Sequence, residues 1–306
     1  MGTLVPDISR ARAAAQVLYR AFSTTGIHGR TDMPEDLLPQ GMERGSLEHI
    51  LFITLTVAID YQRDAPALWK SARETYTDPA TRYLFNPQKV FETSYDALFH
   101  DMQKYHLSKK QHQDAFIWRT IALTFLKKWS GDPRLFLSDC NWYAPTILSR
   151  LKTDIHPSSR GQQRDFPFLR GDKIGPLWLR MLRDNANISD LKNLDQVPIP
   201  VDIHVARASV SLGVIQGSIE GNLGDVFPLI RKVWAEGVRE LTVKGHPMIA
   251  LDVDEPLWHL SKYGCTYRDP RTGECPQKIS CELKDFCAPG IVHVSSNGVE
   301  IQTNIY

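Results

Sequence analysis

Four cysteines lie close together near the C-terminal end of the chain: Cys265, Cys275, Cys281 and Cys287. They fall within 23 positions, with nine, five and five residues between successive members, and the fifth cysteine, Cys140, lies far from them. In a chain with the composition of an ordinary intracellular protein, thiols stay reduced, and such a group more often binds a metal than forms disulfides. The spacing therefore predicts a metal centre.

The spacing also bears on which metal is bound. Structural zinc sites usually use pairs of cysteines separated by two residues, because two close ligands on one turn pre-form half of a tetrahedron. This segment has no such pair. Wider spacing suits a larger object, such as a [4Fe–4S] cluster. We therefore predict an iron–sulfur cluster, with zinc as the alternative and unliganded thiols as a third reading.

A carboxylate with possible chemistry stands at Asp202, after the extended approach that Pro198 and Pro200 favour. A helix is predicted to begin there, and an N-cap aspartate stabilises a helix by about 1 kcal/mol. The helix N-terminus also favours the ionised form. Such a carboxylate can deprotonate a water or stabilise a neighbouring cation. The sequence does not distinguish an aspartate that only caps the helix from one that also takes part in chemistry.

Basic residues gather between Arg150 and Arg183, where eight lysines and arginines accompany three acids. A charge run of this kind is commonly a solvated face. Within it, Lys173 to Pro176 forms a short apolar hairpin that opens a predicted helix. Backbone N–H groups at a turn containing glycine and at a helix N-terminus can bind a phosphate.

The rest of the composition sets limits on the class of protein. The chain has 306 residues, 42% of them apolar, and a net charge of +1, so it can bury a core but carries no global basic field. The longest apolar run, Ile50 to Ile59, is too short to span a bilayer. The N-terminus lacks an apolar secretory core. We therefore expect a cytoplasmic globular protein that does not enter a membrane.

The elements that must position these residues are mainly helical. Apolar periodicity and capping residues predict ten helices. Their ranges are Ile8–Phe22, Ser46–Leu55, Ala65–Thr75, Pro87–Lys104, Ser108–Trp129, Trp142–Thr153, Gly175–Asn185, Ile203–Val214, Gly224–Val238 and Pro256–Lys262. Gly131 to Pro133 is predicted to end the helix before it, and Asp154 to Gln163 is predicted to form a loop. Ile291–Val294 and Val299–Thr303 alternate around Asn297, which predicts a β-hairpin.

Two segments together resemble a known family. The segment VDIHVARASVSLG, Val201 to Gly213, is similar to the aspartate motif of the helix-hairpin-helix DNA glycosylases, the group that includes endonuclease III and the adenine glycosylase. It departs from that motif at Ser211, where the family often has arginine. SCELKDFC, Ser280 to Cys287, resembles the end of the family's iron–sulfur loop. The family spaces its ligands by six, two and five residues, so this chain keeps the last gap and stretches the first two.

The resemblance implies a mainly α, two-lobed glycosylase fold with a C-terminal iron–sulfur loop and a short terminal β-hairpin. The implied divisions are an N-terminal helical extension at 1–45, a helix-hairpin-helix core at 46–255, a cluster loop at 256–290 and the hairpin at 291–306. The implied activity is excision of a damaged or modified base from double-stranded DNA, by a chain that acts as a monomer.

In such an enzyme Asp202 stabilises an oxocarbenium-like sugar, and in bifunctional members a lysine attacks that sugar. Two alignments disagree about this lysine. One places the family's lysine position on Leu177, which implies a monofunctional enzyme. The other resembles the archaeal oxoguanine glycosylases, whose aspartate motif is similar to Pro198–Asp202, and places the nucleophile on Lys173.

The resemblance also implies residues that contact DNA, and these expectations rest on position within it. The hairpin residues Ile174, Gly175 and Pro176 and the motif residue Arg207 would bind the DNA, and Gln62 and Arg63 would fill the gap left by a flipped-out base. The aromatic residues expected around that base are Tyr61, Trp142, Tyr143 and Trp178, although each is more often a core residue.

Two other classes of function remain open on the sequence alone. The chain could be a DNA-binding protein of the same fold that recognises lesions without catalysis, or a redox protein that uses the cluster as an electron carrier. If the chain is a glycosylase, its substrate could be a host lesion or a modified base of foreign DNA, such as that of a phage.

Overall fold

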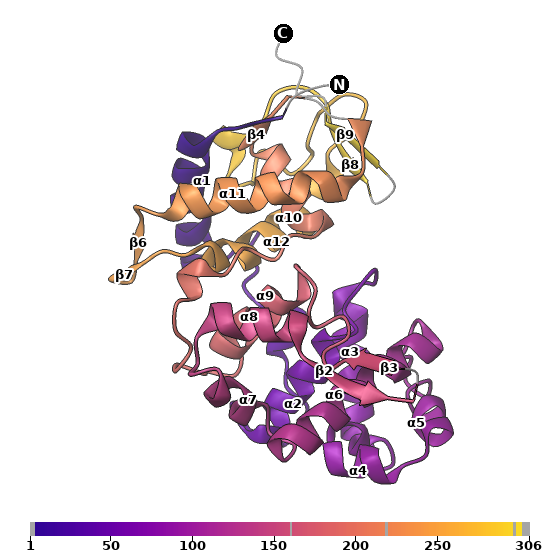
Figure 1. The fold of residues 1–306 in the computed structure, drawn as a ribbon. Helices are drawn as coiled ribbons and strands as arrows, with labels where there is room; N and C mark the ends of the chain where they lie inside the picture. Colours follow the sequence, from indigo (N-terminus) through magenta and orange to yellow (C-terminus); the bar gives the residue numbers. More distant parts are fainter. Residues whose placement is uncertain (1–3, 160, 218–219, 296–297, 302–306) are drawn as a thin grey trace. The chain divides into compact units, whose positions relative to one another are not determined.

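The computed structural model describes residues 4–159, 161–217, 220–295 and 298–301. In this part of the chain the structure is mainly helical, with twelve α-helices and a few short sheets, which confirms the predicted class (Figure 1). The chain divides into two compact units. A terminal unit comprises Met1–Asp32 and Val197–Tyr306, and a central unit comprises Met33–Gln196. No helix among the described residues is both long and apolar enough to cross a membrane.

In its described residues, the terminal unit contains four α-helices and short antiparallel strand pairs. Its helices are α1 (Ile8–Thr24), α10 (Ile203–Ser211), α11 (Phe227–Val238) and α12 (Asp254–Tyr263), and its 3₁₀ turns are Leu223–Val226, Ala250–Val253, Cys265–Tyr267 and Lys284–Phe286. Its strands are β1 (Val5–Pro6), β4 (Ile215–Gln216), β5 (Glu220–Gly221), β6 (Thr242–Val243), β7 (His246–Pro247), β8 (Val292–Ser295) and β9 (Gly298–Ile301). They pair as β1–β4, β6–β7 and β5–β9–β8.

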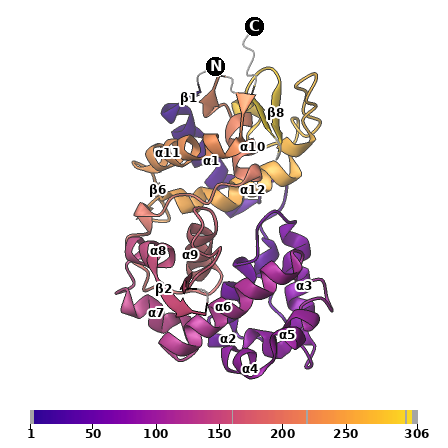
Figure 2. The same ribbon diagram turned by 45° about the vertical axis from the view of Figure 1, so that its right-hand side comes forward.

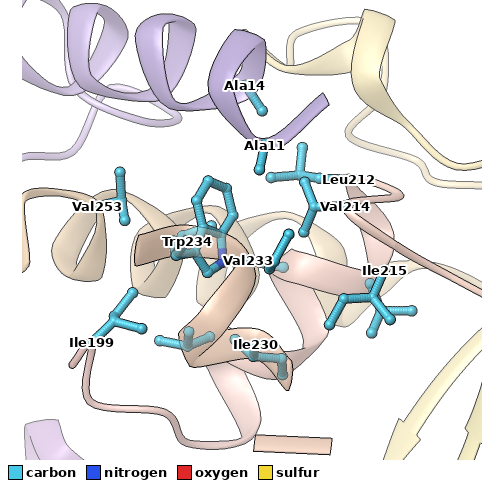
Figure 3. Close-up of a cluster of buried hydrophobic side chains, with 14 of the residues drawn as sticks. Ala11, Ala14, Ile199, Leu212, Val214, Ile215, Ile230, Val233, Trp234 and Val253 are labelled. Atoms are coloured by element: carbon cyan, nitrogen blue, oxygen red, sulfur yellow. The ribbon is translucent and has the colours of Figure 1, made fainter. Parts of the chain in front are cut away.

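Close helix packing joins the two ends of the chain in the terminal unit. α1 packs on α11, and α10 packs on α12. A Cβ atom added to Gly237 of α11 would lie 2.8 Å from the Cβ atom of Ala11, so only glycine permits this approach. Figure 3 shows Trp234 surrounded by aliphatic side chains of this core, and its indole N–H donates to the hydroxyl of Ser209 over 2.8 Å.

The central unit contains the other eight helices, which can be followed in Figure 2. They are α2 (Leu47–Val57), α3 (Ala65–Thr77), α4 (Pro87–Glu92), α5 (Tyr95–Asp101), α6 (Gln111–Trp129), α7 (Pro133–Asp139), α8 (Ala144–Thr153) and α9 (Ile174–Asp184). Its strands β2 (Ile155–Ser158) and β3 (Gly161–Arg164) form a hairpin, and its 3₁₀ turns are Pro34–Asp36, Arg82–Phe85 and Leu194–Gln196.

A network of aromatic rings fills the core of the central unit. Phe85 lies between Phe52 and Trp118, with ring centroids 5.2 and 5.1 Å away. The indole N–H of Trp118 donates to the carbonyl of Leu84 over 2.7 Å, so this buried polar group is paired. The rings come from helices far apart in the sequence, and their packing therefore holds the unit together.

Most predicted helices are confirmed, with ends shifted by a few residues. Ser46 caps α2 through a bond from the His49 amide, as predicted. The predicted single helix over 87–104 is wrong, because Ser94 accepts the Ala97 amide and begins a separate helix, α5. The predicted stop at Gly131 to Pro133 is confirmed, because α6 ends at Trp129, and Pro133 also opens α7, whose cap is Asp132.

Two further predictions concern strands. The predicted loop at 154–163 is wrong, because this segment contains β2 and the start of β3, which pair from Ile155↔Arg164 to Ser158↔Gly161. The predicted terminal hairpin is confirmed in its two strands, which pair from Val292↔Ile301 to Ser295↔Gly298. Asn297 of its predicted turn, and the predicted end of its second strand at Thr303, lie outside the described residues.

The two units are a division in space, whereas the predicted boundaries at 45, 255 and 290 divide the chain by resemblance. Those boundaries stay predictions. Each candidate residue can nevertheless be assigned to one of the two units. Asp202 and the segment from Cys265 to Cys287, called the cysteine segment below, belong to the terminal unit. Lys173 and the predicted hairpin that follows it belong to the central unit.

Candidate functional site

The carboxylate of Asp202 is fixed at the beginning of α10. Its Oδ1 atom accepts the backbone N–H of His204 over 2.8 Å and that of Val205 over 3.0 Å. The capping role predicted from the sequence is therefore confirmed. The residue is half-buried, and two N–H donors at a helix N-terminus favour its anionic form. The site thus holds a carboxylate in a fixed orientation, partly shielded from solvent.

Arg207 lies one turn further along α10 and connects the helix to two neighbouring elements. Its guanidinium donates to the Ser261 hydroxyl of α12 and to the Val294 carbonyl of β8, each over 3.3 Å. Burial lowers the pKa of Arg207, and the nearby charges of Cys265 and Asp202 oppose this shift. The structure therefore places this predicted DNA contact inside the terminal unit, between the Asp202 cap and the cysteine segment.

Two arginines fasten the cysteine segment to the rest of the terminal unit. Arg268 donates to the carbonyl of Gly273 over 2.8 Å and to those of Ala288 and Gly290 over 2.5 and 2.6 Å, which folds the segment back on itself. Arg10 of α1 donates to the carbonyls of Leu212 and Phe286. The segment is thus tied to α1 and to the end of α10.

The four cysteine thiols predicted as ligands lie close enough to affect one another's ionisation. Burial raises the pKa of Cys265 to about 12, and the neighbouring thiols of Cys281, Cys287 and Cys275 add to the shift. Burial likewise raises the pKa of Cys281 to about 11, with Cys287 and Cys275 again contributing. Burial also raises the pKa of Cys287, against the charge of Arg268. The charges of these thiols influence one another, and the four-cysteine metal centre stays a prediction.

A group of possible metal ligands includes one of these thiols. Among the described residues, His28, Cys281 and Glu282 each offer one ligand atom, and these atoms all lie within 4.8 Å of one another. The Nε2 atom of His28 is buried without a hydrogen-bond partner, and the Glu282 carboxylate accepts the His28 amide. Sequence reasoning missed His28, because 253 positions separate it from Cys281 and no local motif marks it.

Lys173 lies at the N-cap position of α9 in the central unit, where its amine forms an ion pair. Its Nζ atom is 3.4 Å from Oδ2 of Asp60, a carboxylate whose side chain is 6% exposed, while the lysine side chain is 28% exposed. The amine is therefore reachable from solvent. Asp60 was not among the predicted site residues, and its position after the apolar helix α2 is the only sequence signal that it gave.

The hairpin residues that precede and open α9 are less available than predicted. Ile174, Gly175 and Pro176 are all buried in the first turn of the helix. The Gly175 amide already donates to the carbonyl of Gly171 over 2.9 Å. A Cβ atom on Gly175 would lie 3.0 Å from Leu148, so this glycine serves close packing of α8 and α9.

The loop after α2 places its three predicted residues in different roles. Tyr61 donates to Asp114 over 2.5 Å and stacks on Phe168, with ring centroids 4.3 Å apart. Arg63 also turns inward, with its side chain 7% exposed and 3.9 Å from Asp114. Gln62 is exposed at the tip, with φ +53° and its side-chain carbonyl accepting from Lys110 over 2.6 Å. Of the three, Gln62 alone has the position expected for a gap-filling residue.

The remaining predicted pocket aromatics are dispersed through the central unit. Trp178 is fully buried, and its indole N–H donates to Thr54 over 2.9 Å, so it is a core residue. Trp142 lines a hollow of about 380 Å³ beside the start of α2. The hydroxyl of Tyr143 donates to Gln196 over 3.3 Å. Within the central unit, the hollow beside Trp142 is the place where one of these aromatics faces open space.

The chain was compared with known proteins by family model and by sequence. No family model matches it, and the search of curated proteins finds no match.

Proposed function

We propose that the protein is a DNA N-glycosylase of helix-hairpin-helix architecture that excises a damaged or modified base from double-stranded DNA. The observation that carries this proposal is the Asp202 carboxylate, fixed by two backbone N–H groups within the segment VDIHVARASVSLG. The resemblance of that segment to the glycosylase motif supplies the reaction class. The geometry supplies a fixed, partly shielded carboxylate, which that reaction needs.

In the proposed reaction the bond between C1′ of the deoxyribose and the base nitrogen breaks. The base leaves with the bonding electrons and takes up a proton, and positive charge develops on the sugar. The carboxylate of Asp202 stabilises that charge and accepts the proton of the water that adds to C1′. Preorganised charge of this kind stabilises a transition state without rearrangement during the reaction.

The place of Lys173 in the reaction depends on its proton. The ion pair with Asp60 favours the ammonium form, which is not a nucleophile. Attack on the sugar would require the proton to leave, and the Asp60 carboxylate is the acceptor within reach. The ion pair therefore supports hydrolysis through Asp202 as the main reaction, with Lys173 lyase chemistry as the alternative mechanism.

We further propose that the four cysteines hold a [4Fe–4S] cluster, with zinc as the alternative. Buried thiols near one another oppose each other's ionisation, so a cationic partner would be needed to stabilise their thiolate forms. A single zinc ion with four sulfur ligands needs them about 3.8 Å apart, from a Zn–S distance of about 2.3 Å. Paired cysteines pre-form such a compact set, and the wide spacing in this segment instead favours the larger centre. Bound there, a cluster would shape the segment around Lys278 and Lys284 against DNA phosphates.

A panel of duplexes tests the activity, each carrying one lesion or modified base. The proposal predicts that one class of base yields abasic sites, seen as strand breaks after alkali. A chain that binds duplexes in a salt-sensitive manner but releases no base from any of them would instead be a non-catalytic binding protein. A reversible one-electron couple that DNA does not affect would support an electron carrier.

Borohydride trapping in the same assay decides the mechanism. A covalent complex that is lost in Lys173→Ala, together with strand cleavage without alkali, would add the lyase step. Base release without a trapped complex would support the hydrolytic reaction through Asp202.

A further inference from the structure

The central unit contains a cavity that the proposed reaction does not use. It has a volume of about 590 Å³ and lies between one face of α6 and the β2–β3 hairpin. This size is within the range of pockets that hold small organic ligands, roughly 300–1,000 Å³. The residues that line it are Tyr95, Phe116, Arg119, Thr120, Leu123, Thr124, Lys127, Lys128, His156, Pro157, Gln163 and Asp165. None of them belongs to the candidate site described above.

Asp165 organises the polar part of this cavity. Its side chain is fully buried, and its two carboxylate oxygens bind different partners, Lys128 Nζ and His156 Nδ1, the latter over 2.7 Å. Gln163 of the hairpin donates to Thr120 of α6 over 3.1 Å. The contacts join both walls of the cavity, so Lys128, His156 and Gln163 are held in place before a ligand arrives.

The cavity carries a positive charge. Three basic side chains against one acid leave a formal charge of +2 with His156 neutral. Asp165 is already paired with Lys128, so the excess charge resides on Arg119 and Lys127. Cations in a partly enclosed pocket attract anions more strongly than the same cations on an open surface. Phosphate is the common biological anion that arginine and lysine bind.

Part of the lining is apolar and partly aromatic. Phe116 projects from α6 with 44% of its surface exposed, which is unusual for a phenylalanine, and Leu123 and Pro157 lie along the same cavity. Exposed aromatic rings next to basic side chains are the pattern that binds nucleobases, since every base has a face that stacks on a ring.

We propose that this cavity is a nucleotide-binding site, in which Arg119 and Lys127 bind the phosphate and Phe116 contacts the base. His156 is held by Asp165 through Nδ1, which leaves its other ring nitrogen to bind the sugar or the phosphate. The nucleotide is either a free nucleoside monophosphate or one unit of a nucleic-acid strand, and both have the same chemistry. The proposal does not depend on base excision.

Isothermal titration with nucleoside 5′-monophosphates tests the site on the full chain. Lys127→Glu should weaken binding about tenfold or more, the factor expected for one charge-assisted hydrogen bond. Phe116→Ala should weaken it by a similar factor, since base–aromatic stacking contributes comparably. Lys70→Gln, a matched exposed lysine on α3 of the same unit, should bind as the wild type does.

Two further titrations separate the sources of the nucleotide. If a short 5′-phosphorylated oligonucleotide binds and the monophosphates do not, the ligand is a strand, provided that Lys127→Glu and Phe116→Ala still weaken binding. Inorganic phosphate should bind much more weakly than either. The proposal is overturned if phosphate binds as well as the nucleotides, if no nucleotide binds, or if the two substitutions have no more effect than Lys70→Gln.

Lys127 and Phe116 are not among the proposed catalytic residues. The nucleotide-site proposal and the glycosylase proposal can therefore be tested separately. Loss of base release in Asp202→Asn with intact nucleotide binding would leave this site standing. Absence of nucleotide binding in a chain that still excises a base would remove this site alone.

Discussion

The two units of the protein are built around different kinds of core. In the terminal unit the buried hydrophobic cluster of the described residues is mainly alanine, valine, isoleucine and leucine, with Trp234 as its one fully buried aromatic member. In the central unit, rings from segments far apart in the sequence touch one another, from Phe52 through Phe85 to Trp118. Tryptophan and phenylalanine bury more surface per residue than aliphatic side chains do.

The difference suggests how each unit is stabilised. The terminal unit joins both ends of the chain, and Cys265 and Cys281 pack directly against its aliphatic core. A metal centre there would close a long, irregular segment that has little regular structure of its own. The central unit is one continuous stretch with a large aromatic core, and it needs no such closure. The terminal unit should therefore depend on the cysteines, and the central unit should not.

The largest expected effect is that of Cys281→Ser. Structural metal sites contribute on the order of 10 kcal/mol, so this variant should lose its iron and acid-labile sulfide, and the terminal unit should unfold first. Limited proteolysis should then leave a resistant fragment close to 33–196. Iron analysis measures the loss of the cluster, and mass spectrometry identifies the resistant fragment.

Cys140→Ser is the matched control, because Cys140 is the buried cysteine of the central unit and takes no part in the cysteine segment. Equal loss of iron in both variants, or full iron content in Cys281→Ser, would contradict the proposed dependence.

A smaller but still large effect is expected for Trp118→Ala in the central unit. Truncation of a fully buried tryptophan should lower the free energy of unfolding by about 3–5 kcal/mol, because it leaves a cavity and an unpaired Leu84 carbonyl. Denaturant unfolding of the central unit measures the loss. Iron content should stay unchanged, and its loss would show that the two units are not stabilised independently.

Acid should weaken both units over the same pH range. Burial lowers the pKa of His49 in the central unit and of His259 in the terminal unit to about 4. As the pH falls from 6.5 towards 4, the unfolded chain binds a proton at each histidine while the folded chain does not, so unfolding becomes easier. The expected loss is about 2 kcal/mol per histidine between pH 7 and pH 5.

Urea unfolding at pH 7 and pH 5 measures this loss. His49→Gln should reduce the pH dependence of the central unit alone, and His259→Gln that of the terminal unit alone. If the free energy of unfolding depends on pH in the same way in both variants as in the wild type, these histidines are not the cause of that dependence.

The local features of the fold could be predicted from the sequence where one residue decides them. Ser46 and Asp202 were both identified as helix starts, since each combines a capping side chain with a following apolar pattern. The same signal at Ser94 begins a helix that was not predicted, and the Asp132–Pro133 pair, predicted as a stop, also begins α7. Pro133 stops one helix and opens the next, and the sequence alone does not separate these uses.

The candidate sites were harder to predict, because their polar partners lie far apart in the chain. Arg63 was expected to face DNA, but Asp114, 51 positions away, holds it inside the protein. Asp60 and Lys173 meet across 113 positions. No periodicity or local motif connects such pairs, because they are brought together only by the packing of helices. The four cysteines could be singled out because they lie in one segment, and the metal centre that they would hold stays a prediction.

The central claim is that Asp202 provides the charge for base release, and single-turnover kinetics of Asp202→Asn tests it most directly. Asparagine can still cap α10 but carries no charge, so duplex affinity should be retained while base release slows by about 10²–10⁴-fold. Asp7→Asn, which makes the same change at the cap of α1, should excise at the wild-type rate. Wild-type release by Asp202→Asn, on a duplex that the unaltered protein processes, would contradict the account.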